Sequence, residues 1–324
     1  MNTPRQRIAR FNYLAAEVQS SLFRNGQVGL TRNPDGSDSD LHGLDLVEVE
    51  LTVQDARVEP EAPMLDQRGF ELLEQPLERP DFDFMDADAI ARAHYPEVEA
   101  VVRDAVGASY AVAFDHNLRW AGGKKEKLRL DRGQEVQAPI QLTHGDYTLT
   151  SAPERLRQLS KPPSGNDTLR DILEDGRSAL DPAHAAQAIR GERRFAIVNL
   201  WRNIAPEPVQ SHPLGVCDAE SVDPSDLVVF EIKYQDRIGE NYFIKHAEGH
   251  RWYFYPHMTR DEPLLIKQWD SAGALARSQG EAGDGRLEGA SSTFSIHSAF
   301  EDPETPAGAP DRRSLEVRCV VMWD

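Results

Sequence analysis

Cysteine is almost absent from the sequence, because Cys217 and Cys319 are the only two among its 324 residues. Two cysteines are too few for a disulfide framework or for a metal site built from several thiolates. Cys319 lies within an apolar run, where a buried thiol is the ordinary expectation. The segment around Cys217 places no histidine where it can activate a thiol nucleophile. We therefore assign neither cysteine a catalytic role.

Long apolar segments are also missing. No stretch approaches the roughly 20 apolar residues that a membrane-spanning helix needs, and the basic N-terminal segment has no apolar run of the kind found in secretory signals. Basic residues are scarce as well: 36 Lys and Arg face 54 Asp and Glu, which gives a net charge of −18. This charge repels phosphate groups. We expect a cytoplasmic protein that binds neither nucleic acid nor membrane.

Several catalytic signatures do not occur. The sequence has no G-x-S-x-G elbow, no Walker A loop, no G-x-G-x-x-G after a predicted strand and no H-E-x-x-H pair. These patterns mark the common serine hydrolases, nucleotide-binding proteins and zinc proteases. The chemistry has to be sought in other residues.

One long helix is predicted over residues 86–107. Asp86 is a suitable N-cap, the apolar residues that follow recur at helical spacing, and Gly107 ends the pattern. Pro96 predicts a kink inside this helix.

The rest of the chain is dominated by short strands with turn residues between them. About ten are predicted, at 109–120, 138–149, 194–204, 213–222, 226–234, 240–246, 250–258, 263–271, 292–300 and 314–323. A helical insertion at 151–193, with Gly176 and Pro182 between two short helices, interrupts them. Many short strands with few helices favour a mainly β fold with flanking helices, and a double-stranded β-helix, or jelly roll, is the common solution at this size.

The domain organisation follows from these elements. A chain of this length can bury one continuous core, so we expect a single domain over residues 1–324. Its parts are an N-terminal arm and cover (1–85), the helix (86–107) and the jelly-roll core with its insertion (108–324).

His144-Gly145-Asp146 is the first candidate for chemistry, because it lies in a predicted strand. Side chains two apart on a strand point to the same face. The motif therefore presents an imidazole beside a carboxylate, as two ligands of one octahedral metal require. Two histidines and one carboxylate, with open positions left over, are the ligand set of non-haem Fe(II) oxygenases.

The third ligand has to come from elsewhere in the chain. His297 lies in a late strand and is the first candidate, and His250 in G-H-R-W-Y-F-Y-P is its competitor. His116 can contribute to a pocket or support a ligand. The remaining histidines have no matching partner and are treated as surface residues: His42, His94, His184, His212, His246 and His257.

The last strand has a polar face. Arg312, Ser314, Glu316 and Arg318 alternate with apolar residues, so they share one side of the strand and can line a cavity. An arginine beside a hydroxyl suits a carboxylate such as the distal one of 2-oxoglutarate. The alternative is that these arginines are solvated charges at a sheet edge.

Several segments together resemble those of a known family, both in their amino-acid sequences and in their order along the chain. They include V-Q-D-A-R, Y-P-E-V-E-A-V-V-R-D-A-V-G-A-S, F-D-H-x-x-R, H-x-D-Y-T, N-L-W-R-N-I, P-L-G-V-C-D-A-E-S-V, H-x-W-Y-F-Y-P, H-S-A-F-E-D-P and R-R-S-L-E-V-R. From about residue 12 to the C-terminus the chain is similar to the CmcJ-like family, which includes the fungal AsaB-type hydroxylase/desaturases and the gibberellin desaturases. The resemblance implies oxidation of a small molecule, often in secondary metabolism, with Fe(II), 2-oxoglutarate and dioxygen on a double-stranded β-helix.

Carried over by motif, the resemblance supports His144 and Asp146 as ligands. It supports His297 as the third, although His250 also belongs to the family pattern. Arg312 falls at the R-x-S position, with Ser314, and Arg318 at the next arginine, so both arginines are assigned to the carboxylate of the co-substrate. The insertion at 151–193 and the Gly-rich loop at 278–292 are longer than the family pattern, which leaves the substrate open.

Two other functions remain compatible with the residues. One is a non-catalytic β-barrel that binds a small ligand. The other is a cupin-type metal enzyme that does not use 2-oxoglutarate.

Overall fold

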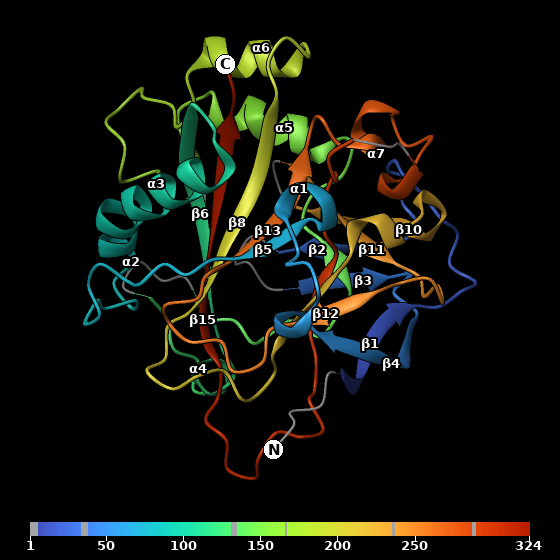
Figure 1. The fold of residues 1–324 in the computed structure, drawn as a ribbon. Coiled ribbons are helices and arrows are strands. Elements are labelled where there is room, and N and C mark those ends of the chain that lie inside the picture. The colour runs from blue at the N-terminus through green and yellow to red at the C-terminus, as the bar shows by residue number, and fades with distance from the viewer. Residues whose placement is uncertain (1–5, 34–37, 131–134, 166, 235–236, 287–289) are drawn as a thin grey trace.

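Two β-sheets form the body of the protein in its computed structural model (Figure 1). The structure describes residues 6–33, 38–130, 135–165, 167–234, 237–286 and 290–324. Helices lie against one face and one end of the smaller sheet, with α3 beside β6 and with α5 and α6 at the end where the chain finishes. The predicted mainly β, jelly-roll architecture is confirmed.

The smaller sheet has five antiparallel strands, and its centre is wholly buried. In spatial order they are β5 (Phe70–Leu72), β13 (Leu264–Asp270), β8 (Phe195–Asn203), β15 (Arg313–Met322) and β6 (Tyr110–Trp120). Every residue of β8 is buried, as expected for a central strand covered on both faces. Apolar and polar residues therefore alternate less regularly along β8 than along a strand with one exposed face.

The larger sheet has ten strands drawn from both ends of the chain. In spatial order they are β1 (Gln6–Leu14), β4 (Leu46–Asp55), β12 (Trp252–Phe254), β9 (Leu214–Cys217), β14 (His297–Ala299), β7 (His144–Gly145), β11 (Ile238–Ile244), β10 (Leu227–Lys233), β2 (Gly29–Arg32) and β3 (Asp38–His42). The pairs β10–β2 and β12–β4 are parallel. The short strands at the middle, β14 and β7, carry the chemistry described below.

The helices are short, apart from the one predicted over 86–107. They are α1 (Leu65–Arg68), α2 (Ala87–Ala89), the π-helical η2 (Ile90–His94), α3 (Tyr95–Val106), α4 (Ala121–Lys125), α5 (Ser151–Leu159), α6 (Pro182–Ile189) and α7 (Ala274–Arg277). Single 3-10 turns are η1 (Ala56–Val58), η3 (Ala219–Ser221), η4 (Pro224–Asp226) and η5 (Asp284–Arg286).

The predicted helix is present, and its ends are as expected. Asp86 caps the start by accepting a hydrogen bond from the backbone of Ala89, and Gly107 ends it in the left-handed conformation with φ 62°. The irregularity expected near Pro96 takes the form of the π-helical segment η2, directly before α3. Proline cannot donate a backbone hydrogen bond, and a wider turn accommodates that loss.

Residues 1–85, expected as an arm and cover, contribute strands to both sheets. Along β1 the side chains of Ala9, Phe11 and Tyr13 are buried while those between them are more exposed. Its backbone pairs with β4 over nine residues, Gln6–Leu14 against Leu46–Gln54.

The prediction of one strand over 138–149 is wrong in extent, because only His144 and Gly145 lie in the ladder. The residues before them bind scattered partners: Thr143 donates its backbone N–H to Asn12, and the Ile140 carbonyl accepts from Ala299. No continuous ladder forms, and after Asp146 the chain turns into α5.

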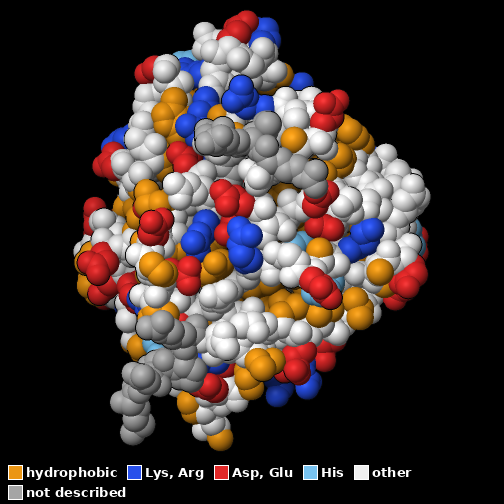
Figure 2. All heavy atoms as spheres, turned by 45° about the vertical axis from the view of Figure 1, so that its right-hand side comes forward, with side chains coloured by type: hydrophobic (Ala, Val, Ile, Leu, Met, Phe, Trp, Pro, Cys, Tyr) orange, Lys and Arg blue, Asp and Glu red, His pale blue; other side chains and the backbone are white. Residues whose placement is uncertain are grey.

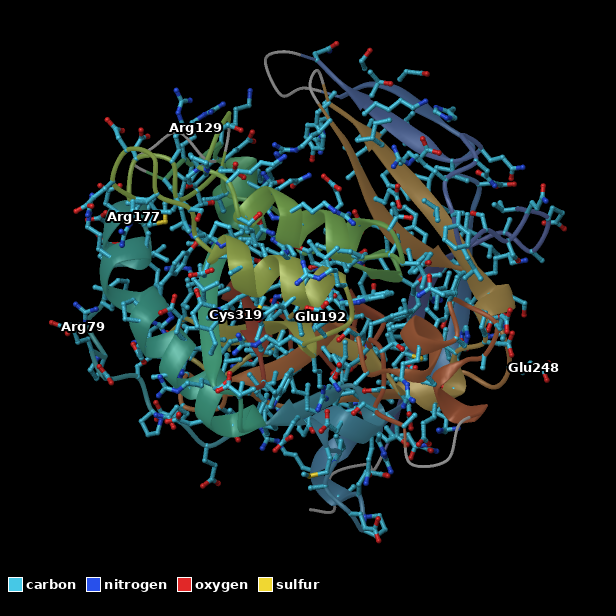
Figure 3. All side chains as sticks on the ribbon, turned by 90° about the horizontal axis from the view of Figure 1, so that it is seen from above. Arg79, Arg129, Arg177, Glu192, Glu248 and Cys319 are labelled. Atoms are coloured by element: carbon cyan, nitrogen blue, oxygen red, sulfur yellow. The ribbon has the colours of Figure 1, made fainter. Side chains whose placement is uncertain are left out.

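The thiol of Cys319 is buried, as expected, and that of Cys217 is buried as well. Figure 3 shows Cys319 in the interior near the helices, while Arg79, Arg177 and Glu248 lie at the rim. Burial raises the pKa of the Cys217 thiol to about 12.

Acidic and basic side chains are interspersed over the face drawn in Figure 2, with apolar side chains between them. Within the described residues, no helix has the length and apolar character needed to cross a membrane.

Candidate metal centre and adjoining cavities

Strand pairing brings His144 and His297 together although they lie 153 positions apart in the sequence. β7 lies between β11 and β14, and His297 is the residue directly opposite His144 in the β14–β7 ladder. Their ring centroids are 4.4 Å apart. Asp146 follows β7, and one ligand atom from each of the three residues lies within 4.8 Å of the others. This is the only cluster of at least three such His, Cys, Asp or Glu side chains within the described ranges.

The hydrogen bonds of the two imidazoles leave one nitrogen of each available. His144 Nδ1 lies 2.7 Å from the carbonyl oxygen of Leu142, and His297 Nδ1 lies 3.5 Å from that of Ser295. A carbonyl can only accept, so each Nδ1 carries the proton and each Nε2 keeps its lone pair. Such a contact fixes the tautomer of a metal-binding histidine.

The two oxygens of Asp146 differ in their surroundings. Oδ2 accepts from Nδ2 of Asn199 at 3.1 Å and from Nε of Arg318 at 3.0 Å, both from the smaller sheet. Oδ1 lies 3.8 Å from Nε2 of His144. One oxygen is therefore held in place while the other faces the imidazoles. The site lies where the two sheets meet.

The protonation states suit a metal. Burial, followed by the nearby His297, lowers the pKa of His144 to about 4, and burial lowers the pKa of His297. Burial alone would raise the pKa of Asp146, but Arg318 and the two imidazoles lower it further than burial raises it. Two neutral imidazoles and one carboxylate are the forms in which these groups bind a divalent metal.

A second set of polar groups borders the imidazoles. A small cavity of about 20 Å³ is lined by Arg119, Ile140, His144, Trp201, Leu214, His297, Ser298, Ala299, Arg312 and Glu316. Arg312 is only 3% exposed, and burial, followed by the charge of Arg119, lowers its pKa to about 9. In the described part of the chain, Nε of Arg312 and Oγ of Ser314 have no hydrogen-bond partner. Two unsatisfied buried polar groups on one strand face indicate a missing polar ligand.

Arg318 has a different environment. Its guanidinium contacts Asp146 and Asp115 at 3.0 Å each and Glu316 at 3.2 Å. Although burial alone lowers the pKa of Arg318, these three carboxylates raise it well above its ordinary value. The prediction that Arg318 shares the polar face of Arg312 holds, but its contacts join it to the candidate ligand Asp146.

Sequence reasoning missed Asn199 and gave Arg119 no role. Asn199 lies in the N-L-W-R-N-I segment, whose uniformly buried pattern makes a polar side chain unusual, and this is the signal that was available. Arg119 lies in F-D-H-x-x-R on β6. Its Nη1 donates to the carbonyl of Ala138 at 3.2 Å, and its side chain reaches the cavity beside Arg312.

The competing histidines lie elsewhere. Nδ1 of His250 lies 3.4 Å from the Tyr13 hydroxyl, and its Nε2 lies 3.2 Å from a carboxylate oxygen of Asp226. His250 therefore belongs to another buried cluster. His116 contacts the Tyr95 hydroxyl at 2.8 Å, on the side of β6 that α3 covers. The expectation that His94 is a surface residue is wrong: it is 1% exposed and pairs with Glu97 at 3.0 Å.

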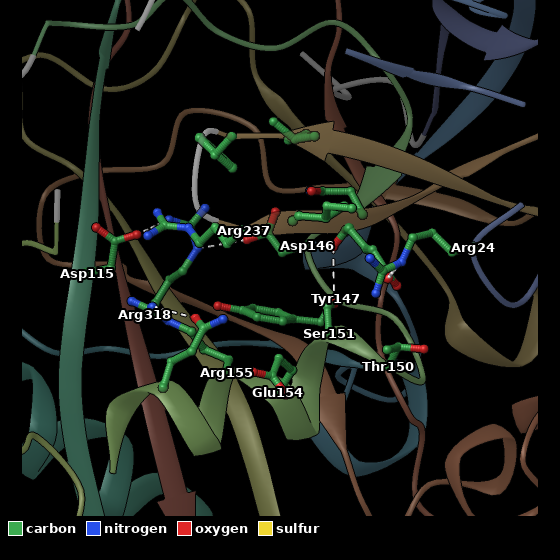
Figure 4. A pocket seen from close by; sticks show the side chains of 17 residues that line it. Arg24, Asp115, Asp146, Tyr147, Thr150, Ser151, Glu154, Arg155, Arg237 and Arg318 are labelled. Atoms are coloured by element: carbon green, nitrogen blue, oxygen red, sulfur yellow. Dashed lines mark hydrogen bonds and ion pairs between the residues drawn. The ribbon is translucent and has the colours of Figure 1, made fainter. Parts of the chain in front are cut away.

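A larger cavity opens on the other side of Asp146 (Figure 4). Its volume is about 210 Å³. Asp146, Asp115 and Arg318 line it on the side of the candidate metal ligands. The turn before α5 and α5 itself contribute Tyr147, Thr150, Ser151, Glu154, Arg155 and Gln158. The described residues of the β10–β11 hairpin that line it are Ile232, Tyr234, Arg237, Ile238, Gly239, Glu240 and Asn241. Arg24 completes the lining.

The chain belongs to the family described as "Oxidoreductase/YMDC permease-like domain", whose model matches residues 11–322. It is also 41% identical over 194 residues to a Methylophilus leisingeri protein named "Uncharacterized protein in dcmA 3'region", with 60% of this chain and 88% of that protein covered.

Two further relatives have names that state an activity. The hydroxylase/desaturase poxK of Penicillium oxalicum is 26% identical, covering 85% of this chain and 79% of its own. The Fe(II)/2-oxoglutarate-dependent dioxygenase nvfI of Aspergillus novofumigatus is 27% identical, covering 83% and 81%. A solved structure titled iron and alpha-ketoglutarate-dependent endoperoxidase NvfI superposes with a TM-score of 0.72 at 21% identity over 99% of both chains. The resemblance to the hydroxylase/desaturase family is confirmed, and so is the fold.

Proposed function

We propose that this protein is a non-haem iron oxygenase that uses 2-oxoglutarate and dioxygen to hydroxylate or desaturate a small organic molecule. The observation that carries the proposal is the buried cluster of His144, Asp146 and His297, whose ligand atoms lie within 4.8 Å of one another. Relatives named as Fe(II)/2-oxoglutarate-dependent dioxygenases and hydroxylase/desaturases support the same chemistry.

In this proposal, Nε2 of each histidine and Oδ1 of Asp146 hold Fe(II). When bound, Fe(II) would supply the oxidising chemistry, in which 2-oxoglutarate and dioxygen give succinate and carbon dioxide, and the second oxygen atom leaves in the hydroxylated product or as water. His144, Asp146 and His297 would supply three ligands, which would leave positions on the metal for the keto acid and dioxygen. Asn199 and Arg318 keep Asp146 in its orientation by holding its other oxygen.

Arg312 and Ser314 would bind the distal carboxylate of 2-oxoglutarate. They lie beside the imidazoles, and the unsatisfied Nε of Arg312 and hydroxyl of Ser314 are donors of the kind that a carboxylate accepts from. Arg119 faces the same space and adds a second positive charge. We assign Arg318 to Asp146 rather than to the co-substrate, because three carboxylates already surround its guanidinium.

Binding of the co-substrate requires side chains to move. A cavity of about 20 Å³ has room for water but not for a dicarboxylate. Arg119 is the mobile partner in this proposal, because among the described residues its guanidinium makes one hydrogen bond, to the backbone carbonyl of Ala138. Its movement toward the incoming carboxylate would close the site against water, which strengthens the ion pairs within it.

The experiment is succinate release from 2-oxoglutarate in the presence of Fe(II) and dioxygen, without added substrate. We expect slow uncoupled turnover by the protein and a loss of at least about a hundredfold in Asp146→Asn, which keeps the shape of the side chain but removes its charge. Equal turnover by the two proteins would remove Asp146 from the site. Dioxygen uptake that does not depend on 2-oxoglutarate would favour a cupin-type enzyme instead.

We also propose the cytoplasm as the location of this enzyme, as its charge and composition led us to expect. Cell fractionation with an antibody to a C-terminal tag tests this assignment.

A further inference from the structure

The cavity beside Asp146 has a charge pattern that the proposed iron chemistry does not require. Its described lining contains four arginines (Arg24, Arg155, Arg237 and Arg318) and four acidic residues (Asp115, Asp146, Glu154 and Glu240). The numbers of positive and negative side chains are equal, so the net charge of the described lining is close to zero. A free charge for a ligand therefore has to come from a side chain without an ionic partner.

Three of the arginines are matched by carboxylates. Arg318 contacts three of them, as described above. Arg24 pairs with Glu240 at 2.6 Å, and Arg155 pairs with Asp167 at 3.2 Å. These pairs hold the cavity wall together and leave no excess of positive charge.

Arg237 differs from the other three. Its guanidinium carbon lies 4.8 Å from the ring centroid of Tyr234, a cation–π contact. No ion pair or side-chain hydrogen bond joins Arg237 to any residue in the described ranges. It lies directly before β11, on the hairpin that lines the cavity, and is neither fully buried nor fully exposed.

A second donor projects into the same cavity. Tyr147, directly after Asp146, lines the cavity, and its hydroxyl has no hydrogen-bond partner among the described residues. Figure 4 shows its ring lying between α5 and the β10–β11 hairpin, with the hydroxyl toward the side where Arg318 projects. A phenol hydroxyl is a hydrogen-bond donor, so Tyr147 can donate to a ligand in this cavity.

We propose that this cavity is the substrate site and that it selects small organic acids, whose carboxylate forms an ion pair with Arg237 and accepts a hydrogen bond from Tyr147. The inference rests on the proposed oxygenase function, because the nearness of Asp146 is what makes the cavity a place for the reacting carbon. The guanidinium presents a fork that matches a carboxylate. In this arrangement the carboxylate group of the substrate lies away from the metal site, and its carbon skeleton points toward that site.

The size of the cavity limits the substrate. A volume of about 210 Å³ lies below the range of about 300–1,000 Å³ that is common for sites of drug-sized ligands. A compact acid fills it, whereas a larger one has to protrude from it.

The test compares acids with their methyl esters, which have nearly the same shape and no charge. Benzoate, phenylacetate and cyclohexanecarboxylate, each beside its ester, are titrated into the protein loaded with Mn(II) and 2-oxoglutarate, and binding is followed by ligand-observed NMR. We expect at least one acid to bind about tenfold or more tightly than its ester. In Arg237→Gln this preference falls below about threefold.

Two further variants serve as controls. Arg237→Lys keeps the charge and should keep most of the preference. Lys233→Gln removes a charge from the same hairpin at a residue that does not line the cavity, and should leave the preference unchanged. Near-ultraviolet circular dichroism of each variant shows whether the fold is intact.

The proposal is overturned if no acid is preferred over its ester, if the preference survives in Arg237→Gln, or if Lys233→Gln abolishes it equally. These outcomes differ from a failure of the oxygenase function, which would appear as a wild-type protein that binds neither Mn(II) nor 2-oxoglutarate in the same samples.

Discussion

Replacing Arg312 by glutamine gives a sharp test of the co-substrate site. The guanidinium is 3% exposed, one of its terminal nitrogens donates to the carbonyl of His212, and its carbon lies 5.4 Å from the ring centroid of Trp201. These contacts fix the side chain before any ligand binds. Its Nε has no partner among the described residues, so the bound carboxylate would satisfy it.

The magnitude follows from removing one partner of a buried charge pair, which costs about 2–5 kcal/mol. At about 1.4 kcal/mol for each tenfold change, the Kd for 2-oxoglutarate should rise at least about 30-fold in Arg312→Gln. Metal affinity should stay close to that of the wild type, because Arg312 contacts none of the three candidate ligands.

The assay is a titration of 2-oxoglutarate into protein that holds Mn(II), with 2-oxobutyrate as a second ligand that lacks the distal carboxylate. The wild type should prefer 2-oxoglutarate strongly, and Arg312→Gln should lose most of that preference. Arg313→Gln is the matched control: it removes the neighbouring arginine, which stacks on Trp120 at 4.0 Å and is exposed.

The reasoning is refuted if Arg312→Gln binds 2-oxoglutarate within about twofold of the wild type while still holding metal. It is also refuted if Arg313→Gln weakens binding to the same extent, because the effect would then come from general positive charge.

The remaining predictions concern the surroundings of the site. Asn199→Leu should weaken metal binding about 10- to 100-fold, the usual effect of losing a hydrogen bond to a ligand, in a competitive titration with a chelating dye; unchanged affinity would mean that Arg318 alone holds the carboxylate. Arg119→Gln should raise the Kd for 2-oxoglutarate by about tenfold, less than Arg312→Gln does, because the Arg119 side chain contacts the carboxylate only after it has moved. A rise in Kd equal to or larger than that of Arg312→Gln would contradict this prediction. At pH 8, burial and the raised pKa of Cys217 should prevent both thiols from reacting with an aromatic disulfide reagent until the protein unfolds; rapid labelling of the native protein would contradict it.

The sequence predicted the local features of this fold well. The N-cap at Asp86 and the C-cap at Gly107 depend only on residues nearby and on the backbone conformations that they favour. The polar face of the last strand follows from the two-residue repeat of a strand, and the structure places Arg312, Ser314 and Glu316 together in the interior.

Features that depend on strand pairing were harder to predict. His297 lies opposite His144 because of the register between β7 and β14, two strands of three residues or fewer, and no local pattern encodes that register. His250 was the second candidate for the third ligand, and its contacts with Tyr13 and Asp226 place it in another cluster.

The N-terminal strand β1 was missed for a similar reason. Its alternation is visible at Ala9, Phe11 and Tyr13, but the segment also contains Arg7 and Arg10, and it was assigned to the N-terminal arm rather than to a strand. Its partner β4 lies about forty residues later in the chain, so the ladder that stabilises β1 is not visible locally.

The most direct test of the central claim is an anomalous-scattering map from a crystal loaded with Fe(II) under anaerobic conditions. We expect one strong peak per chain, about 2.0–2.2 Å from Nε2 of His144, Nε2 of His297 and one oxygen of Asp146. A map with no peak at these three residues, or with its peak at His250, would contradict the account.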